Sequence, residues 1–315
     1  MSKRTVFPRI AADDRSAAQG PGPVAQGRPG LRAMLELVRD AVSAWSRDYA
    51  PSMGAALSYY TIFSIAPLLL IVISIAGMFY GEEAARGAVF YQVRDLMGDG
   101  AAVALQGLLA SARKPAEGIV AAVIGVALLV VGASSVFGEL QSALDRIWHV
   151  PEQEKSGGLW KLLRTRLVSF AMIIGIGLLL IASLLASAML AVLEKWWGTL
   201  FGARALLASA LNIGLSYLMI TVMFAMIYKI MPRVRIAWRD VWTGAAITSL
   251  LFTAGKYAIG LYIGTSGVSS TFGAAGSLVV ILVWVYYSAQ IFLLGAEFTW
   301  VYAHRYGSRR SSRST

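Results

Sequence analysis

Cysteine is absent from this chain of 315 residues, which excludes disulfides and thiolate metal sites. Charged side chains are scarce, at 14% of the residues, whereas soluble proteins carry about 25%. Histidine occurs only twice, at His149 and His304, and neither copy has a partner at the spacing of a zinc site. These shortages argue against thiol and zinc chemistry and place the chain outside the composition of soluble proteins.

Several enzyme motifs are also missing. The sequence contains no HExxH, no GxSxG and no GxxxxGK[ST] phosphate-binding loop. We therefore expect no catalytic residues, no cofactor, no bound metal and no ATP-driven transport by this chain alone. Residues 1–30 are polar, with clusters of proline and glycine, and lack the apolar segment of a signal peptide. We expect them to form a disordered cytoplasmic tail, so the first membrane helix must act as its own insertion signal.

Hydrophobic residues make up 57% of the chain and are concentrated in long runs. The first run, residues 49–81, contains no charged side chain, and a bilayer core is crossed by about 20 apolar residues in a helix. The sequence predicts an all-α, polytopic integral membrane protein. Its domain, residues 31–305, has six transmembrane helices, and residues 306–315 form a basic disordered tail. The predicted spans cover approximately residues 54–80, 118–147, 167–193, 205–230, 241–263 and 274–302.

The distribution of Lys and Arg predicts the orientation. Of the 28 basic side chains, 21 lie on one side of the predicted spans and 6 on the other, and Lys256 falls inside a span. Because basic residues are retained in the cytoplasm, both termini are expected there. The net charge of +11 is explained by this topology, so we expect no nucleic-acid partner.

Two regions outside the spans show helical patterns. In residues 31–49, apolar side chains recur at helical spacing opposite charged ones, which indicates an amphipathic helix. It either lies in the lipid headgroups or packs on the cytoplasmic face of the bundle. Residues 82–117 form a mixed loop, in which we expect short amphipathic helices broken at 98–100, where the sequence is Gly-Asp-Gly.

The first span carries an unusual proline. Pro67 lies near its middle and removes a backbone donor, so a bend near Phe63 is expected, with the proline face directed into a helix bundle. Tyrosines are numerous in the apolar runs, and Tyr59 and Tyr60 precede this proline. Hydroxyl groups that point inward would give a partly hydrated interior, compatible with a large amphiphile.

Polar side chains at membrane depth are costly and usually face a bundle interior or a wet cavity. Lys256 lies roughly 22 Å from the cytoplasmic end of its helix, where it either reaches the outer headgroups or lines a cavity that holds an anionic group. Gln290 is the polar residue nearest to it in depth. Glu139 and Glu297 lie near the inner boundary, too deep for Glu297 to pair with Lys256. With Arg164 and Arg166 at the same level, they form either a charge-paired cytoplasmic collar or a gate that binds protons.

Four segments together resemble one known family. They are AALSYYTIFSIAPLLL (55–70), FGELQSALDRIWHV (137–150), MPRVRIAWRDVWTGAAIT (231–248) and FGAAGSLVVILVWVYYSAQIFLLGAEFTW (272–300). Their order and spacing, over about residues 32–305, are similar to the YihY/BrkB family of bacterial inner-membrane proteins. The resemblance implies six membrane helices and a link to envelope lipid export or serum resistance. It implies no catalytic residues. Members of the family were once labelled ribonuclease BN, but this sequence has no cluster of metal-binding side chains that would support a nuclease.

These observations favour a protein that moves or flips an amphipathic envelope molecule, a lipid or glycolipid, within the lipid bilayer. The candidate cavity residues are Lys256, Glu139, Glu297, Gln290, Tyr59, Tyr60 and Pro67. A membrane scaffold that transports nothing is the first alternative, and it predicts a dry, closely packed interior. A channel or exchanger for small ions is the second, and it predicts a narrow polar path through Glu139 or Glu297. A homo-oligomer is compatible with each of them.

Overall fold

The computed structural model describes residues 31–112, 135–151, 204–265 and 275–309, together with three single positions. All regular elements in these ranges are helices. Residues 1–30 and 310–315, the linker 266–274, most of the predicted span 118–147 and all but three positions of the predicted span 167–193 lie outside the described residues. The helices are α1 Leu31–Arg47, α2 Ala50–Tyr80, α3 Glu82–Met97, α4 Asp99–Ala112, α8 Arg204–Ile230, α9 Trp238–Thr265 and α11 Gly276–Arg305, and residues 135–147 form one more.

The apolar runs form the long helices that their length predicts. Four of them, α2, α8, α9 and α11, match the predicted segments to within about one helical turn. Segments within α8, α9 and α11 are long and apolar enough to cross a membrane, and these are Ile213–Ile230, Trp238–Thr265 and Gly276–Arg305. Large apolar side chains such as Ile213, Leu250 and Leu261 are more than 60% exposed on them. Exposed faces of this kind are suited to lipid rather than to water.

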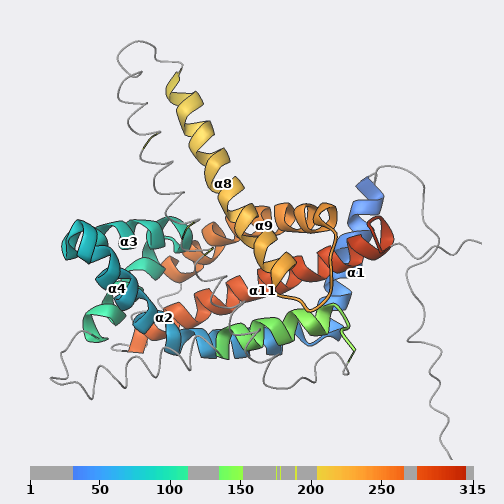
Figure 1. Ribbon diagram of the computed structural model, residues 1–315, viewed down its shortest axis with the longest axis horizontal. Coiled ribbons are helices and arrows are strands. Elements are labelled where there is room, and N and C mark those ends of the chain that lie inside the picture. The colour runs from blue at the N-terminus through green and yellow to red at the C-terminus, as the bar shows by residue number, and fades with distance from the viewer. Residues whose placement is uncertain are drawn as a thin grey trace, which may run out of the picture.

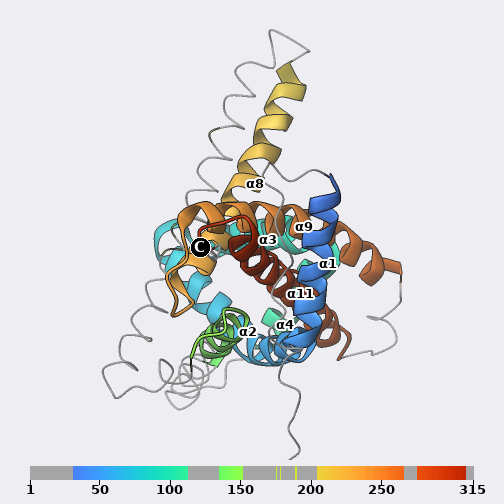
Figure 2. The ribbon, with the colours of Figure 1, turned by 90° about the vertical axis from the view of Figure 1, so that its right-hand side faces the viewer.

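The central element is α11, which contacts α9, α2, α4 and α1. Figures 1 and 2 show it between α9 on one side and α2 on the other. At one end of the bundle lies α1, and at the opposite end lie α3 and α4 (Figure 1). We call these the α1 end and the α3–α4 end. The N-terminal part of α8 projects from the other described helices, while its C-terminal part packs on α9 (Figure 1).

The connections at the α3–α4 end confirm the predicted break. Gly81 separates α2 from α3, and Gly98 separates α3 from α4. Both glycines have positive φ angles, 83° and 80°, which side chains with a Cβ rarely adopt. The chain therefore turns sharply at both positions, and α3 and α4 pack against each other and against α2.

The amphipathic helix α1 is confirmed, but it combines the two arrangements that the sequence left open. Leu37 and Ala41 are buried against Phe298 and Val301 of α11. An adjoining apolar stripe is exposed, and it consists of Met34, Leu35, Val38 and Val42. Packing onto the bundle therefore uses one face of α1, while a second apolar face remains available to lipid headgroups.

Glycine and threonine interlock where α9 crosses α11. A Cβ on Gly244 of α9 would lie 2.7 Å from the Cβ of Thr299, and one on Gly295 of α11 would lie 2.8 Å from the Cβ of Thr248. Both distances are shorter than van der Waals contact. The two helices therefore approach closely, as small residues permit in membranes. We call these four residues the glycine–threonine interlock.

Tyr228 of α8 joins the same crossing. Its side chain is fully buried, and its hydroxyl donates to the carbonyl oxygen of Phe292 at 2.7 Å. The hydroxyl oxygen of Tyr228 also lies 3.1 Å from Thr248 Oγ1, whose own proton goes to the carbonyl oxygen of Gly244. A buried hydroxyl is costly unless it is paired, so the bond to Phe292 fixes the depth at which α8 meets α9 and α11.

Candidate functional site

The sequence-predicted residues at the start of α2 do not all face inward. Tyr59 is 58% exposed and its ring packs edge-on against Phe63, with centroids 5.0 Å apart. Tyr60 is half-buried. Among the other tyrosines in apolar runs, Tyr257 and Tyr262 are also more than half exposed. Most of these rings therefore lie on the outer surface of the described bundle, where tyrosine suits the membrane interface.

The hydroxyl groups that precede Pro67 bond to their own helix. The side-chain oxygens of Ser58, Thr61 and Ser64 each donate to a carbonyl three or four residues earlier, at 2.7–3.1 Å. The helix itself continues through Pro67 from Ala50 to Tyr80. These hydroxyls are satisfied locally, and the bend before Pro67 stays a prediction.

Lys256 lies half-buried on α9. Its ammonium group is 5.4 Å from the centre of the Tyr257 ring, a cation–π geometry. Because Tyr257 is 66% exposed, this pair lies at the surface of the described helices. Glu139 is half-buried in the helix formed by residues 135–147.

Gln290 and Glu297 lie two turns apart on α11 and face the start of α2. The amide nitrogen of Gln290 is 3.4 Å from the carbonyl oxygen of Pro51, and a Cβ on Gly54 would lie 3.0 Å from Gln290 Cδ. Gln290 Oε1 is buried and has no hydrogen-bond partner among the described residues. The close approach of Gln290 therefore requires glycine at position 54.

Glu297 is fully buried. Neither of its carboxyl oxygens has a hydrogen-bond partner in the described part of the chain. The charged groups that act on it are Asp48 and Arg47, from the junction between α1 and α2. Tyr49, in that junction, has a left-handed backbone with φ 59°. A buried carboxyl without partners is costly, and such groups are often functional.

Other charged residues at the α1 end are paired. Asp145 is 2% exposed and accepts the backbone N–H of Arg233 at 2.9 Å, with the guanidinium 3.5 Å away. Asp240 accepts two bonds from Ser308, at 2.6 and 3.0 Å. These contacts bring together three segments that are remote in sequence. They assign the two aspartates a structural role.

Arg305, in the last turn of α11, holds α1 in place. It donates to Asp40 at 2.8 Å and to Glu36 at 3.0 Å. The predicted collar of Glu139, Glu297, Arg164 and Arg166 remains a prediction, because its two arginines lie outside the described residues. Within the described ranges, Glu297 forms no ion pair.

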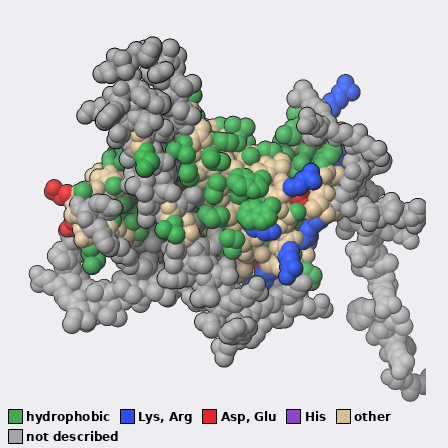
Figure 3. Space-filling view, turned by 45° about the horizontal axis from the view of Figure 1, so that its top comes forward, with side chains coloured by type: hydrophobic (Ala, Val, Ile, Leu, Met, Phe, Trp, Pro, Cys, Tyr) green, Lys and Arg blue, Asp and Glu red, His purple; other side chains and the backbone are tan. Residues whose placement is uncertain are grey.

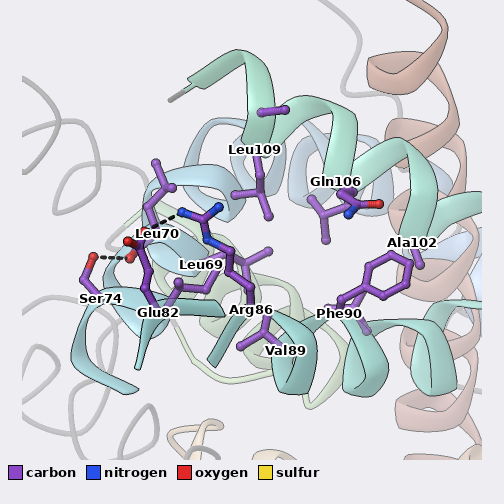
Figure 4. A pocket seen from close by; sticks show the side chains of 14 residues that line it. Leu69, Leu70, Ser74, Glu82, Arg86, Val89, Phe90, Ala102, Gln106 and Leu109 are labelled. Carbon is purple, nitrogen blue, oxygen red and sulfur yellow. Dashed lines mark hydrogen bonds and ion pairs between the residues drawn. The ribbon is translucent and has the colours of Figure 1, made fainter. Parts of the chain in front are cut away.

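A cavity of about 200 Å³ lies at the α3–α4 end, between α2, α3 and α4. Its wall is mostly apolar, with Leu69, Ile73, Val89, Phe90, Leu105 and Leu109 among its residues. Ser74, Glu82, Arg86 and Gln106 supply its polar groups. Figure 4 shows Arg86 directed across the cavity, and Ser74 donates to the carbonyl oxygen of Leu70 one turn earlier in α2, at 2.8 Å.

Glu82 and Arg86 form an ion pair one turn apart on α3. The arginine side chain is 33% exposed and that of the glutamate is 62% exposed, so the pair stands at the border between the apolar wall and the outside. None of the sequence-predicted candidates lines this cavity. One sequence pattern could have pointed to this cavity. The spacing of Glu82, Arg86, Val89 and Val93 in the mixed loop places charged and apolar side chains on one short helix.

Comparisons with known proteins show that this chain is similar to membrane proteins. The family model described as virulence factor BrkB matches residues 41–315. A UPF0761 membrane protein of Pseudomonas aeruginosa (strain LESB58) is 25% identical over 268 residues, which are 83% of this chain and 61% of that protein. One from Kangiella koreensis is 25% identical over 84% of this chain and 62% of its own length. One from Tolumonas auensis is 27% identical over 81% of this chain and 82% of its own length.

The chain spans about three fifths of the length of the first two of these relatives. The names of all three relatives describe membrane proteins and state no activity. No solved structure matches.

Proposed function

The chain belongs to the BrkB family of membrane proteins, and on that premise we propose that it moves an amphipathic envelope molecule, a lipid or glycolipid, across the membrane. The observation that supports this proposal is the cavity between α2, α3 and α4. Its apolar wall suits a hydrocarbon chain, and its charged pair suits a polar headgroup. A site of this composition is typical of ligand pockets, which are mostly apolar with a few placed polar groups.

The proposed topology has six spans with both termini in the cytoplasm of a bacterial cell. The α1 end carries Arg233, Arg239, Arg305 and Arg309, and in Figure 3 Lys and Arg side chains gather toward this end. The positive-inside rule places it in the cytoplasm. The cavity at the α3–α4 end would then open toward the outer leaflet of the inner membrane.

A reconstituted assay tests the proposal. The purified chain in liposomes should move a fluorescent phospholipid between leaflets faster than protein-free liposomes do. Ala110 lines the cavity and is exposed, so Ala110→Trp should fill the opening and slow the movement several-fold. Val103→Trp is the matched control, because Val103 is 60% exposed on the same helix and lies outside the cavity wall. Equal rates in protein-containing and empty liposomes would contradict the proposal.

Movement of a small ion is a second candidate, and Glu297 supports it. A buried carboxyl without partners beside Asp48 is the kind of group that ion exchangers use. An ion flux that Glu297→Gln abolishes, in liposomes that move no lipid, would replace the first proposal with this one.

A scaffold without transport is the third candidate, and the glycine–threonine interlock supports it. Close backbone contact between α9 and α11 leaves no room for a path between them. The same liposomes should then show neither lipid movement nor ion flux.

A further inference from the structure

We propose that the α2–α3–α4 cavity binds part of one acyl chain of a zwitterionic phospholipid, with Arg86 at the phosphate and Glu82 at the ammonium group of the headgroup. This inference builds on the proposed function, since it names the lipid class and the binding groups at the same cavity. Neither residue is among the sequence-predicted candidates, and both come from α3, outside the long apolar helices.

The volume and wall of the cavity decide how much of a lipid can enter. An apolar cavity of about 150 Å³ holds a molecule as small as benzene, and drug-sized ligands need roughly 300 Å³ or more. A volume of about 200 Å³ therefore suits a short stretch of one hydrocarbon chain rather than a whole lipid. The wall combines side chains of three helices, such as Ile73 of α2, Phe90 of α3 and Leu105 of α4. Buried apolar surface of this kind favours a hydrocarbon over water.

The charged side chains at the cavity determine which class of lipid headgroup fits. Glu82 and Arg86 are paired on consecutive turns of α3, and the arginine is directed across the cavity (Figure 4). A guanidinium has five N–H donors, and the ion pair with Glu82 uses one nitrogen, Nη2. Other donors of Arg86 can therefore reach a phosphate while Glu82 keeps the side chain in place.

A headgroup with a single sign of charge fits this pair less well. A net anion at Arg86 would be repelled by the Glu82 carboxylate, and a net cation at Glu82 would be repelled by the guanidinium. A phosphate joined to an ammonium by a short linker carries both signs, as the pair does. Specificity then comes from repulsion of the wrong headgroups as well as attraction of the right one.

The position of the cavity agrees with this ligand. It is formed by the second half of α2 with α3 and α4, at the end of the bundle opposite to α1. Glu82 and Arg86 follow directly after Tyr80, the last residue of the long apolar helix α2. The charged pair therefore lies where an apolar helix ends, which is the level of lipid headgroups in the proposed topology.

Photo-crosslinking tests the proposal with defined lipids. The full chain, reconstituted in liposomes, is exposed to a phosphatidylethanolamine that carries a diazirine in one acyl chain, and labelled peptides are mapped by mass spectrometry. Labels should fall on α2, α3 and α4. Unlabelled phosphatidylethanolamine should compete several-fold better than phosphatidylglycerol, which is a net anion.

Three variants separate the parts of the site. Arg86→Gln should lower labelling about tenfold, the loss expected for one charge-assisted hydrogen bond. Glu82→Gln should shift the preference toward phosphatidylglycerol, because the repelling carboxylate is gone. Ala110→Trp should reduce labelling with every headgroup. Arg94→Gln is the matched control, because Arg94 lies outside the cavity wall near the end of α3, where it forms an exposed ion pair with Asp99 of α4, so labelling should stay unchanged.

Labels outside these helices, or a wild-type preference for phosphatidylglycerol, would overturn the assignment. The two proposals fail separately. If labelling follows the expected pattern while reconstituted protein moves no lipid, the binding site stands and the transport proposal fails. If lipid moves while labels fall elsewhere, transport stands and this site is wrong.

Discussion

Glu297 has the least favourable surroundings of the acidic side chains described in α11 and its neighbours. Asp145 and Asp240 are nearly as buried, yet each has hydrogen-bonded partners. Glu297 has none within the described residues, and a second carboxyl group, that of Asp48, faces it. A carboxyl group buried in this way costs free energy of folding, and Arg47 is the one basic group acting on it among the described residues. Residues of this kind are retained for a task other than stability.

A substitution of Glu297 tests whether its carboxyl group contributes to the stability of the fold. Glu297→Met replaces the carboxyl with an apolar side chain of similar size, and we expect the thermal midpoint of the purified protein to stay the same or rise. The comparison is Asp145→Ala, which removes a paired buried carboxyl and leaves the Arg233 N–H without its acceptor, so it should lower the midpoint. A fall for Glu297→Met as large as that for Asp145→Ala would show that Glu297 makes a stabilising contact.

Single residues could be found from the sequence where they stand out from their surroundings. Glu297, Gln290 and Lys256 are polar within long apolar runs, and the structure places the first two on one face of α11. Glu82 and Arg86 are charged residues in a mixed loop, where charge is ordinary, so only their spacing with Val89 and Val93 sets them apart. Asp48 is likewise ordinary in sequence. Its proximity to Glu297 follows from the turn between α1 and α2, which no spacing rule predicts.

At the scale of elements, the crossing of α9 and α11 is set by the glycine–threonine interlock. The two glycines lie on different helices, and each accommodates a threonine of the other helix. Both threonine hydroxyls donate to carbonyls of their own helices, at 2.7 and 2.8 Å, so no polar group is left unpaired in the contact. The helices are therefore held by shape and close packing, as in other membrane helix pairs.

Alanine at either glycine tests this contact. Gly244→Ala and Gly295→Ala each place a methyl group closer than contact distance to a threonine, so we expect a loss of about 1–3 kcal/mol in the free energy of unfolding. Gly260→Ala is the matched control on α9, because a Cβ there meets no atom within 4 Å. Thermal unfolding in detergent measures the difference. Equal stability of Gly244→Ala and Gly260→Ala would contradict the interlock.

Helices were predictable from the sequence to within about a turn because lipid demands long apolar runs and glycine ends them clearly. The break at Gly98 is an example, since its φ of 80° suits glycine. The packing of helices was less predictable. In α1, the strongest apolar stripe is exposed, while the smaller residues Ala41 and Ala44 are among those buried. The face of α1 that is buried is the one whose shape packs closely against α11, and hydrophobicity alone does not predict which face that is.

At the scale of the whole molecule, charge and apolar surface are arranged along one axis. Basic side chains gather toward the α1 end, and hydrophobic side chains cover much of the middle (Figure 3). The cavity and its ion pair lie at the opposite end. This arrangement agrees with the proposed topology, in which the basic end lies in the cytoplasm.

The absence of cysteine makes the proposed orientation easy to test. Single cysteines can be introduced without background, at Ser46 of α1 and at Glu83 of α3, which are both exposed. In intact cells, a maleimide that enters the periplasm but does not cross the inner membrane should label Glu83→Cys. The same reagent should label Ser46→Cys only after the inner membrane is permeabilised. The reverse pattern, or equal labelling of both, would contradict the orientation.

The position of α11 in the chain has a consequence for biogenesis. α11 follows every other described helix in the chain, and it is the shared neighbour of α1, α2, α4 and α9. While the ribosome is still delivering α9, these earlier segments have entered the bilayer without the partner that unites them. Interlocked contacts such as Gly244 with Thr299 can form only once translation has passed position 299. The contacts that α11 makes with its four neighbours are therefore the last of the described packing to form.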